Sequence, residues 1–208
     1  MQNKKGKLSL FGGGNKKNNS PVASLGKKSG LNSNFKDPSS DYLINDGSLI
    51  KYNGNETHVN IPVELGITKI EQKAFYRRTD IKSIVIPDNV TSIANYAFSG
   101  CENLTSITLP ANLDFLGNYA FEKCKSLTQV NLPDLLTSVG SYLFSGCSSL
   151  VSVHLPTELR TIGNYMFEKC ESLITIEIPK KVSAIGWKSF SGCSTLKNIA
   201  TEFQTKYN

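Results

Sequence analysis

The most regular feature of the chain is a set of apolar positions that return every 23 residues. One unit reads Leu104-Thr105-Ser106-Ile107-Thr108-Leu109-Pro110 and continues through Ala120-Phe121 to Cys124. The phenylalanine column has six members: Phe75, Phe98, Phe121, Phe144, Phe167 and Phe190. A fixed period between about 20 and 50 residues is the sequence signature of a repeat solenoid.

Each unit predicts one short strand and one return segment. The alternation of Ile107, Thr108 and Leu109 points two side chains inward and one outward, as a strand requires. Pro110 ends the strand because proline lacks a backbone donor. The segment with Ala120 and Phe121 returns the chain, and we expect a short helical or 3₁₀ turn there. One coil cannot bury its own apolar face, so the predicted fold class is an α/β repeat solenoid of about six stacked coils with short parallel strands.

The repeating elements also point to a family. A Leu-x-x-Ile-x-Leu core with this period is typical of leucine-rich repeats. The recurring Ile-Pro, Ile-x-x-x-Ala-Phe and Cys-x-x-Leu elements of residues 41–199 resemble the BspA-like, type 5 leucine-rich repeats. The resemblance implies a leucine-rich-repeat horseshoe, and it implies that residues 46–54 with the following Val59-Asn60-Ile61-Pro62 form an N-terminal capping hairpin.

These patterns predict the domain organisation. We expect a basic low-complexity tail over residues 1–40 and a leucine-rich-repeat domain over residues 41–208. Within that domain we expect an N-cap (41–62), the repeats (63–199) and a C-terminal edge (200–208), because terminal repeats are usually atypical. The unpaired edges of an incomplete solenoid also predict self-association by stacking on another chain.

The five cysteines occupy one position in each of five coils. They are Cys101, Cys124, Cys147, Cys170 and Cys193. Zinc ligands usually come in pairs two to four residues apart, and side chains in a stacked column run parallel instead of converging on a disulfide. We therefore predict reduced cysteines that pack in the core, with no metal site and no cofactor.

The outward positions of the predicted strands are the candidate binding surface. Solenoids usually bind partners on the concave strand face, and here that face carries Ser106, Thr108, Gln129, Asn131, Ser152, His154, Thr175 and Glu177. His154 beside a carboxylate has the chemistry of a general base, but neither a nucleophile nor a metal-ligand pattern accompanies it. We therefore predict a protein partner, no catalytic residue, no small-molecule substrate and no enzymatic activity.

Two other patterns each have two interpretations. Tyr96, Tyr119, Tyr142 and Tyr165 form a column that is either a partly buried ladder with its hydroxyls at the surface or an aromatic stripe for docking. Ser-Gly-Cys and Glu-Lys-Cys alternate from coil to coil with a 46-residue period. This alternation either records the duplication of a two-coil unit or has a functional reason.

The net charge of +6 originates in the N-terminal tail, since residues 1–36 contain eight lysines and no acidic residue. Few apolar residues occur there, so we expect the isolated tail to be disordered. Apolar pieces beside lysine pairs suit a motif that orders on an acidic protein surface or a nonspecific polyanion, because lysine gives counterion release without base readout. An inert linker is the alternative. The predicted contacts are Lys4, Lys5, Lys7, Phe11, Lys16, Lys17, Lys27 and Lys28.

The sequence leaves two functional hypotheses. No run of 18 apolar residues predicts a transmembrane segment, and the start of the chain lacks the apolar core of a signal peptide. We therefore expect a cytoplasmic, non-enzymatic interaction or scaffold module whose solenoid face and tail dock onto a larger intracellular assembly. The family resemblance supports the alternative, a cell-surface adhesin or host-interaction module, if a leader has been removed.

Overall fold

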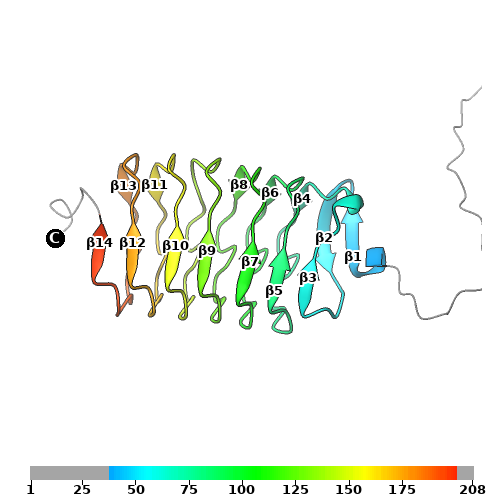
Figure 1. Ribbon diagram of the computed structural model, residues 1–208, viewed down its shortest axis with the longest axis horizontal. Helices are drawn as coiled ribbons and strands as arrows, with labels where there is room; N and C mark the ends of the chain where they lie inside the picture. Colours follow the sequence, from blue (N-terminus) through cyan, green and yellow to red (C-terminus); the bar gives the residue numbers. More distant parts are fainter. Residues whose placement is uncertain (1–37, 201–208) are drawn as a thin grey trace, which may run out of the picture. The chain divides into compact units, whose positions relative to one another are not determined.

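The repeat domain is a row of stacked coils (Figure 1). A computed structural model describes residues 38–200, which belong to the second of two units into which the chain divides between Phe35 and Lys36. The predicted fold class is confirmed: about six coils follow one another at 23-residue intervals, and their strands are short and parallel. Within residues 38–200 no helix is long and apolar enough to cross a membrane.

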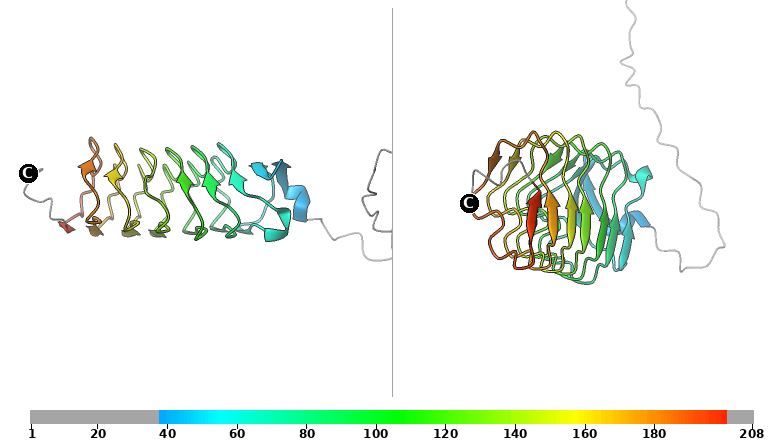
Figure 2. Two further views of the ribbon diagram at one scale, coloured as in Figure 1. Left: turned by 90° about the horizontal axis from the view of Figure 1, so that it is seen from above. Right: turned by 60° about the vertical axis from the view of Figure 1, so that its left-hand side comes forward.

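The strands form two rows along the stack (Figures 1 and 2). The front row consists of β3 (His58–Asn60), β5 (Ser83–Val85), β7 (Ser106–Thr108), β9 (Gln129–Asn131), β10 (Ser152–His154), β12 (Thr175–Glu177) and β14 (Asn198–Ala200). The back row consists of β4 (Lys69–Ile70), β6 (Ser92–Ile93), β8 (Phe115–Leu116), β11 (Thr161–Ile162) and β13 (Ala184–Ile185). Where neighbouring strands of a row pair, as in β3–β5–β7, β9–β10 and β4–β6–β8, equivalent residues of successive coils lie in register, so the sequence columns become physical columns.

A hairpin closes the N-terminal end of the stack. The 3₁₀ helix η1 (Pro38–Asp41) leads into β1 (Tyr42–Asn45), which pairs antiparallel with β2 (Ser48–Tyr52). Asp46 and Gly47 both have positive φ, as a two-residue hairpin turn requires. β2 then pairs in parallel with β4, and η2 (Val63–Leu65) follows β3. The family resemblance implied a capping hairpin at residues 46–54 with residues 59–62; the hairpin instead spans residues 42–52, with Asp46 and Gly47 at its turn.

Arg78 fastens this hairpin to the first coil. It stands at the position that cysteine occupies in the later coils. Its guanidinium donates hydrogen bonds to the carbonyl oxygens of Tyr52 (2.9 Å) and Gly54, and it forms an ion pair with Asp80. The guanidinium also lies 4.9 Å from the centroid of the Tyr52 ring. The hydrogen bond from Arg78 lowers the pKa of the Asp80 carboxyl below its usual value.

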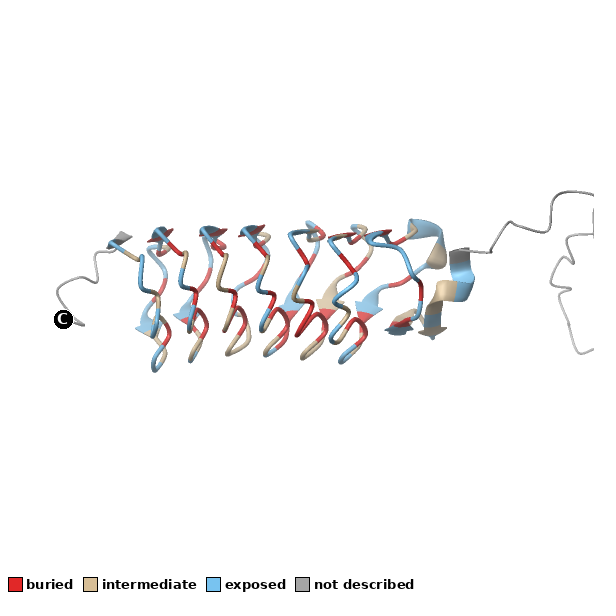
Figure 3. Ribbon diagram, turned by 90° about the horizontal axis from the view of Figure 1, so that it is seen from below, coloured by how far each residue is buried: buried red, intermediate tan, exposed pale blue. Residues whose placement is uncertain are grey.

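The core is a set of stacked columns, seen as the red segments of Figure 3. The rings of Phe75, Phe98, Phe121, Phe144 and Phe167 are fully buried, and successive ring centroids lie 5.1 to 5.7 Å apart. Four of the five cysteines are also fully buried, and all five are free thiols. Each Sγ donates to a phenylalanine carbonyl of the preceding coil, as Cys124 does to Phe98 at 3.3 Å. The cysteines therefore pack in the core and satisfy one backbone acceptor per coil.

The return segments are turns instead of helical pieces. In the coil that contains Phe121, Tyr119 and Lys123 have φ of 58° and 57°, and equivalent positions of other coils are also left-handed. Hydrogen bonds such as that from the Glu122 N–H to the Tyr119 carbonyl (3.2 Å) close single turns, and the left-handed residues prevent these turns from continuing as a 3₁₀ helix. Both 3₁₀ helices of the described residues, η1 and η2, lie in the N-terminal part.

Candidate interaction surface

The eight residues predicted to contact a partner lie together on the front row. They come from β7, β9, β10 and β12, and every one of them is exposed. Alternation within each strand buries the central residue, as with Val130 and Val153, and turns its two neighbours outward. In-register pairing then aligns Gln129 with Ser152 and Asn131 with His154. The predicted residues therefore form two parallel columns on one face.

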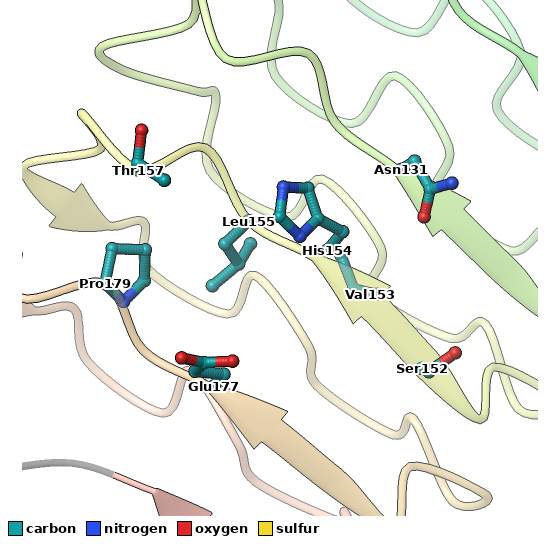
Figure 4. A pocket seen from close by; sticks show the side chains of 8 residues that line it. All are labelled: Asn131, Ser152, Val153, His154, Leu155, Thr157, Glu177 and Pro179. Atoms are coloured by element: carbon teal, nitrogen blue, oxygen red, sulfur yellow. The ribbon is translucent and has the colours of Figure 1, made fainter.

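Four of these residues line a hollow of about 310 Å³ in the second half of the face. Asn131, Ser152, His154 and Glu177 provide its polar groups, and Val153, Leu155, Thr157 and Pro179 complete the lining. In Figure 4, His154 and Glu177 stand on neighbouring strands with the side chain of Leu155 between them. The hollow therefore combines a small apolar floor with hydrogen-bonding groups at its rim.

A turn positions the imidazole of His154. The Nε2 atom lies 3.9 Å from Oδ1 of Asp134, and both side chains are more than half exposed. The same Oδ1 accepts a hydrogen bond of 3.1 Å from the backbone N–H of Thr157 in the next coil. Asp134 therefore holds the turn after β10 and also lies beside His154. Such an exposed pair contributes little to stability.

The front face is polar and nearly uncharged. Among the outward positions of β5, β7, β9, β10 and β12, Glu177 is the one residue with a formal charge when histidine is neutral. At the N-terminal end of the face, Nδ1 of His58 lies 2.7 Å from the hydroxyl oxygen of Ser83. Both histidines of the chain thus belong to this face, which is suited to hydrogen bonding and not to electrostatic steering.

Several lining residues were missed by sequence reasoning. Thr157 and Pro179 border the hollow, and Asp134 lies beside it, yet all three belong to the turns that follow the strands. The sequence did contain a signal for these turn residues. Aspartate follows the proline that recurs every 23 residues in alternate coils, at Asp88 and Asp134. Each accepts a hydrogen bond from a backbone N–H one coil further on. The predicted tail contacts, Lys4 to Lys28 with Phe11, lie outside the described residues.

The acidic and cysteine side chains of the described residues form neither a metal site nor an activated thiol. Within residues 38–200 no three histidine, cysteine, aspartate or glutamate side chains gather closely enough to hold a metal ion. Burial raises the pKa of the Cys101 and Cys147 thiols to about 12 and that of Cys193 to about 11. A cysteine needs a lowered pKa to act as a nucleophile at neutral pH. The cysteine column is therefore structural.

The comparison with family models settles the classification of the repeats. The model described as BspA type leucine rich repeat region matches residues 52–205 with six copies. The chain belongs to the BspA-type leucine-rich repeat family. This assignment agrees with the recurrence of the proline, phenylalanine and cysteine columns and confirms the predicted resemblance. No curated protein matches the chain.

Solved structures with the same fold come from bacteria. The leucine-rich repeat protein of T. pallidum is 26% identical with a TM-score of 0.67, and the match covers 79% of this chain and 92% of that one. A leucine-rich cell surface protein of Faecalibacterium prausnitzii is 29% identical with a TM-score of 0.63. That match covers 79% of this chain but 53% of the other, so the present chain spans about half the length of this relative.

Proposed function

We propose that the repeat domain is a non-enzymatic interaction module that binds a protein partner through the front strand face. The observation that carries the proposal is the double column of side chains from Ser106 to Glu177, which is exposed along its whole length and lies in register between β9 and β10. Such a face presents hydrogen-bonding groups at fixed intervals on a rigid support, and a partner that lies across several coils contacts all of them at once.

The lysine tail is proposed as a second contact. Its eight lysines without an acidic residue suit an acidic protein surface or a nonspecific polyanion. A second contact on the same chain raises the effective concentration of the first one and increases overall affinity without enlarging the strand face. In this form the protein is a scaffold that docks onto a larger intracellular assembly.

One observation favours a second candidate function. The F. prausnitzii relative is described as a cell surface protein, and its identity to this chain is 29%. By analogy, the present repeats would contact a host or matrix protein outside the cell. The same strand face would serve, while the tail would be dispensable for recognition.

The test compares crosslinked partners of the full chain with those of face variants. Ser152→Lys with Thr175→Lys adds two charges and bulk to the front face, while Ser138→Lys with Thr161→Lys makes the same change at exposed residues in the back part of the coils. We expect partner recovery by quantitative mass spectrometry to fall about tenfold for the first pair only. Equal recovery from both pairs would show that the front face is not the contact.

A third variant separates the two candidate functions. Serine replaces the seven tail lysines from Lys4 to Lys28 in the full-length chain. Loss of a cytoplasmic assembly in this variant supports the scaffold, whereas tail-independent recovery of matrix or surface proteins supports the adhesin.

A further inference from the structure

The backbone position just before the cysteine column is left-handed in all six coils. φ is 56°, 57° and 56° at Arg77, Lys123 and Lys169, and it is 77°, 76° and 79° at Gly100, Gly146 and Gly192. Glycine takes this conformation without a steric penalty, whereas another residue loses about 1 kcal/mol or more. Every second coil nevertheless carries a cation there. Strain that is retained at equivalent positions calls for a compensating role.

Packing explains why a long side chain alternates with glycine. A Cβ atom added to Gly146 would lie 3.2 Å from Cγ of Lys123, and one added to Gly100 would lie 2.9 Å from Cγ of Arg77. The aliphatic part of each cationic side chain therefore packs against the glycine of the following coil. Ser145 adds to this pairing, since its hydroxyl donates to Glu168 at 3.0 Å. Methionine or glutamine would cover the glycine equally well, so packing does not explain the positive charge.

The three cationic groups remain at the surface. Arg77, Lys123 and Lys169 are all exposed. The Arg77 guanidinium lies 5.1 Å from the centroid of the Tyr76 ring, and Nζ of Lys123 lies 3.4 Å from the carboxylate of its sequence neighbour Glu122. Lys169 has no ion-pair partner among the described residues. The ion pair of Lys123 with Glu122 is exposed and therefore weak, so a ligand that runs along the stack can reach all three cations.

Gly100 and Gly146 each line a notch between two of these cations. The notch over Gly100, between Arg77 and Lys123, has a volume of about 370 Å³. The notch over Gly146, between Lys123 and Lys169, has a volume of about 360 Å³. Both notches are also lined by carboxylates and hydroxyls. The first has Glu102, Glu122 and Ser99. The second has Glu171 and Ser148, with Lys125 as a third cation.

This lining selects among acidic polymers. The cations suit an anionic group. The carboxylate of Glu171, and the remaining lone pairs of Glu102 beside its ion pair of 3.0 Å with Lys125, accept hydrogen bonds from donors on the same ligand. Sugar hydroxyls supply such donors. A polyphosphate or a run of acidic residues would instead place further anions beside these carboxylates.

The spacing leads to the same class of ligand. Stacked strands repeat at about 4.8 Å, so notches two coils apart repeat at about 10 Å. This is close to the length of a disaccharide in an extended chain, whereas one nucleic-acid strand carries a charge about every 3.4 Å. We infer that the row Arg77, Lys123 and Lys169 binds an acidic polysaccharide that carries one carboxylate per disaccharide. The surface is separate from the front strand face, and the inference goes beyond the proposed function.

The test uses the full-length chain with serine at the seven tail lysines from Lys4 to Lys28, so that the tail does not bind the anionic probe. A labelled hyaluronan decasaccharide is titrated and followed by fluorescence anisotropy. We expect saturable binding that Lys123→Gly with Lys169→Gly weakens about tenfold, since each exposed ion pair contributes about a factor of three. Both variants place glycine where alternate coils already have it, so thermal unfolding should occur at the same or a higher temperature.

Three comparisons make the outcome decisive. Lys180→Ala with Lys181→Ala removes the same charge at the proline end of the strands, and it should change the affinity less than twofold. A neutral chitin oligosaccharide of equal length should bind at least tenfold more weakly than hyaluronan. Unchanged affinity in the double glycine variant, an equal loss in the control pair, or tighter binding of polyglutamate than of hyaluronan would each overturn the inference; the last result would assign the row to an acidic protein segment.

Discussion

The phenylalanine column and the tyrosine column run through the same coils with the same period, yet they are stabilised in different ways. Phe121 is fully buried, whereas Tyr119, two residues earlier, is half-buried and has a left-handed backbone. The tyrosine rings stack more closely, with centroids 4.5 to 4.6 Å apart and interplanar angles of 4° to 14°. Regular recurrence in a sequence therefore identifies a column but does not show how much the column stabilises the fold.

The largest expected effect on stability comes from removing a ring of the buried phenylalanine column. Phe121→Ala leaves a cavity between two stacked rings, and we expect the free energy of unfolding in urea to fall by about 3–5 kcal/mol. Tyr119→Ala removes a ring of similar size from a half-exposed position and should reduce the free energy of unfolding by less than half as much. Equal losses would mean that the outer stack contributes as much to stability as the core.

Raising the pH should weaken the cysteine column that accompanies the phenylalanines. Burial raises the thiol pKa of Cys101 and Cys147 from 9.0 to about 12, so this contribution is complete below pH 9 and is lost as the pH rises toward 12. Within that window, deprotonation of each thiol lowers the free energy of unfolding by about 1.4 kcal/mol per pH unit. Urea unfolding at pH 9.5 and 10.5 should show a slope to which all five thiols contribute, since burial also raises the pKa of Cys124, Cys170 and Cys193. Cys101→Ala with Cys147→Ala should reduce the slope by the share of two thiols. An unchanged slope would assign the alkaline loss to other groups.

A smaller loss should follow from separating the coils beside the tyrosines. A Cβ atom on Gly140 would lie 2.3 Å from the backbone nitrogen of Asn118, so Gly140→Ala must push two coils apart. We expect a loss of about 1–3 kcal/mol in the free energy of unfolding. Ser138→Ala, at an exposed position two residues earlier, is the matched control and should have no measurable effect.

The smallest expected effect on stability comes from the left-handed backbone of the tyrosine column. Tyr119 has φ of 58°, so Tyr119→Gly loses the stack but relieves the left-handed conformation, whereas Tyr119→Ala only loses the stack. The glycine variant should therefore be more stable than the alanine variant by about 1 kcal/mol, the reverse of their usual order. Thermal unfolding of the two variants measures the difference.

Much of the fold follows from the sequence because each coil repeats the same local solution. The front-row strands and the buried phenylalanine and cysteine columns lie where the pattern indicated. The back-row strands were not predicted, and the capping hairpin begins four residues before the predicted range. The return segments also differ from the prediction, since nothing in the residue types reveals that Tyr119 and Lys123 are left-handed. Arg78 was also overlooked, because its role depends on contacts with the hairpin some 25 residues earlier.

The outward strand residues of the candidate surface could be predicted from the sequence, but the hollow in that surface could not. Alternation placed His154 and Glu177 on the outer face. The hollow between them depends on turn residues such as Thr157 and Pro179, whose position is set by the packing of successive coils. The sequence also left open why Ser-Gly-Cys and Glu-Lys-Cys alternate. The hydroxyl of Ser99 donates a hydrogen bond of 3.1 Å to the carboxylate of Glu122 in the next coil, which gives this alternation a structural basis.

The alternation of large and small residues next to the cysteines restricts how a chain of this kind changes length. Removing one coil, for example residues 124–146, would bring Lys123 against Lys169 and leave no glycine between their stems. Removing two coils would restore the fit. Insertions and deletions that preserve the fold should therefore occur in steps of 46 residues, and the genetic unit of this protein is a pair of coils.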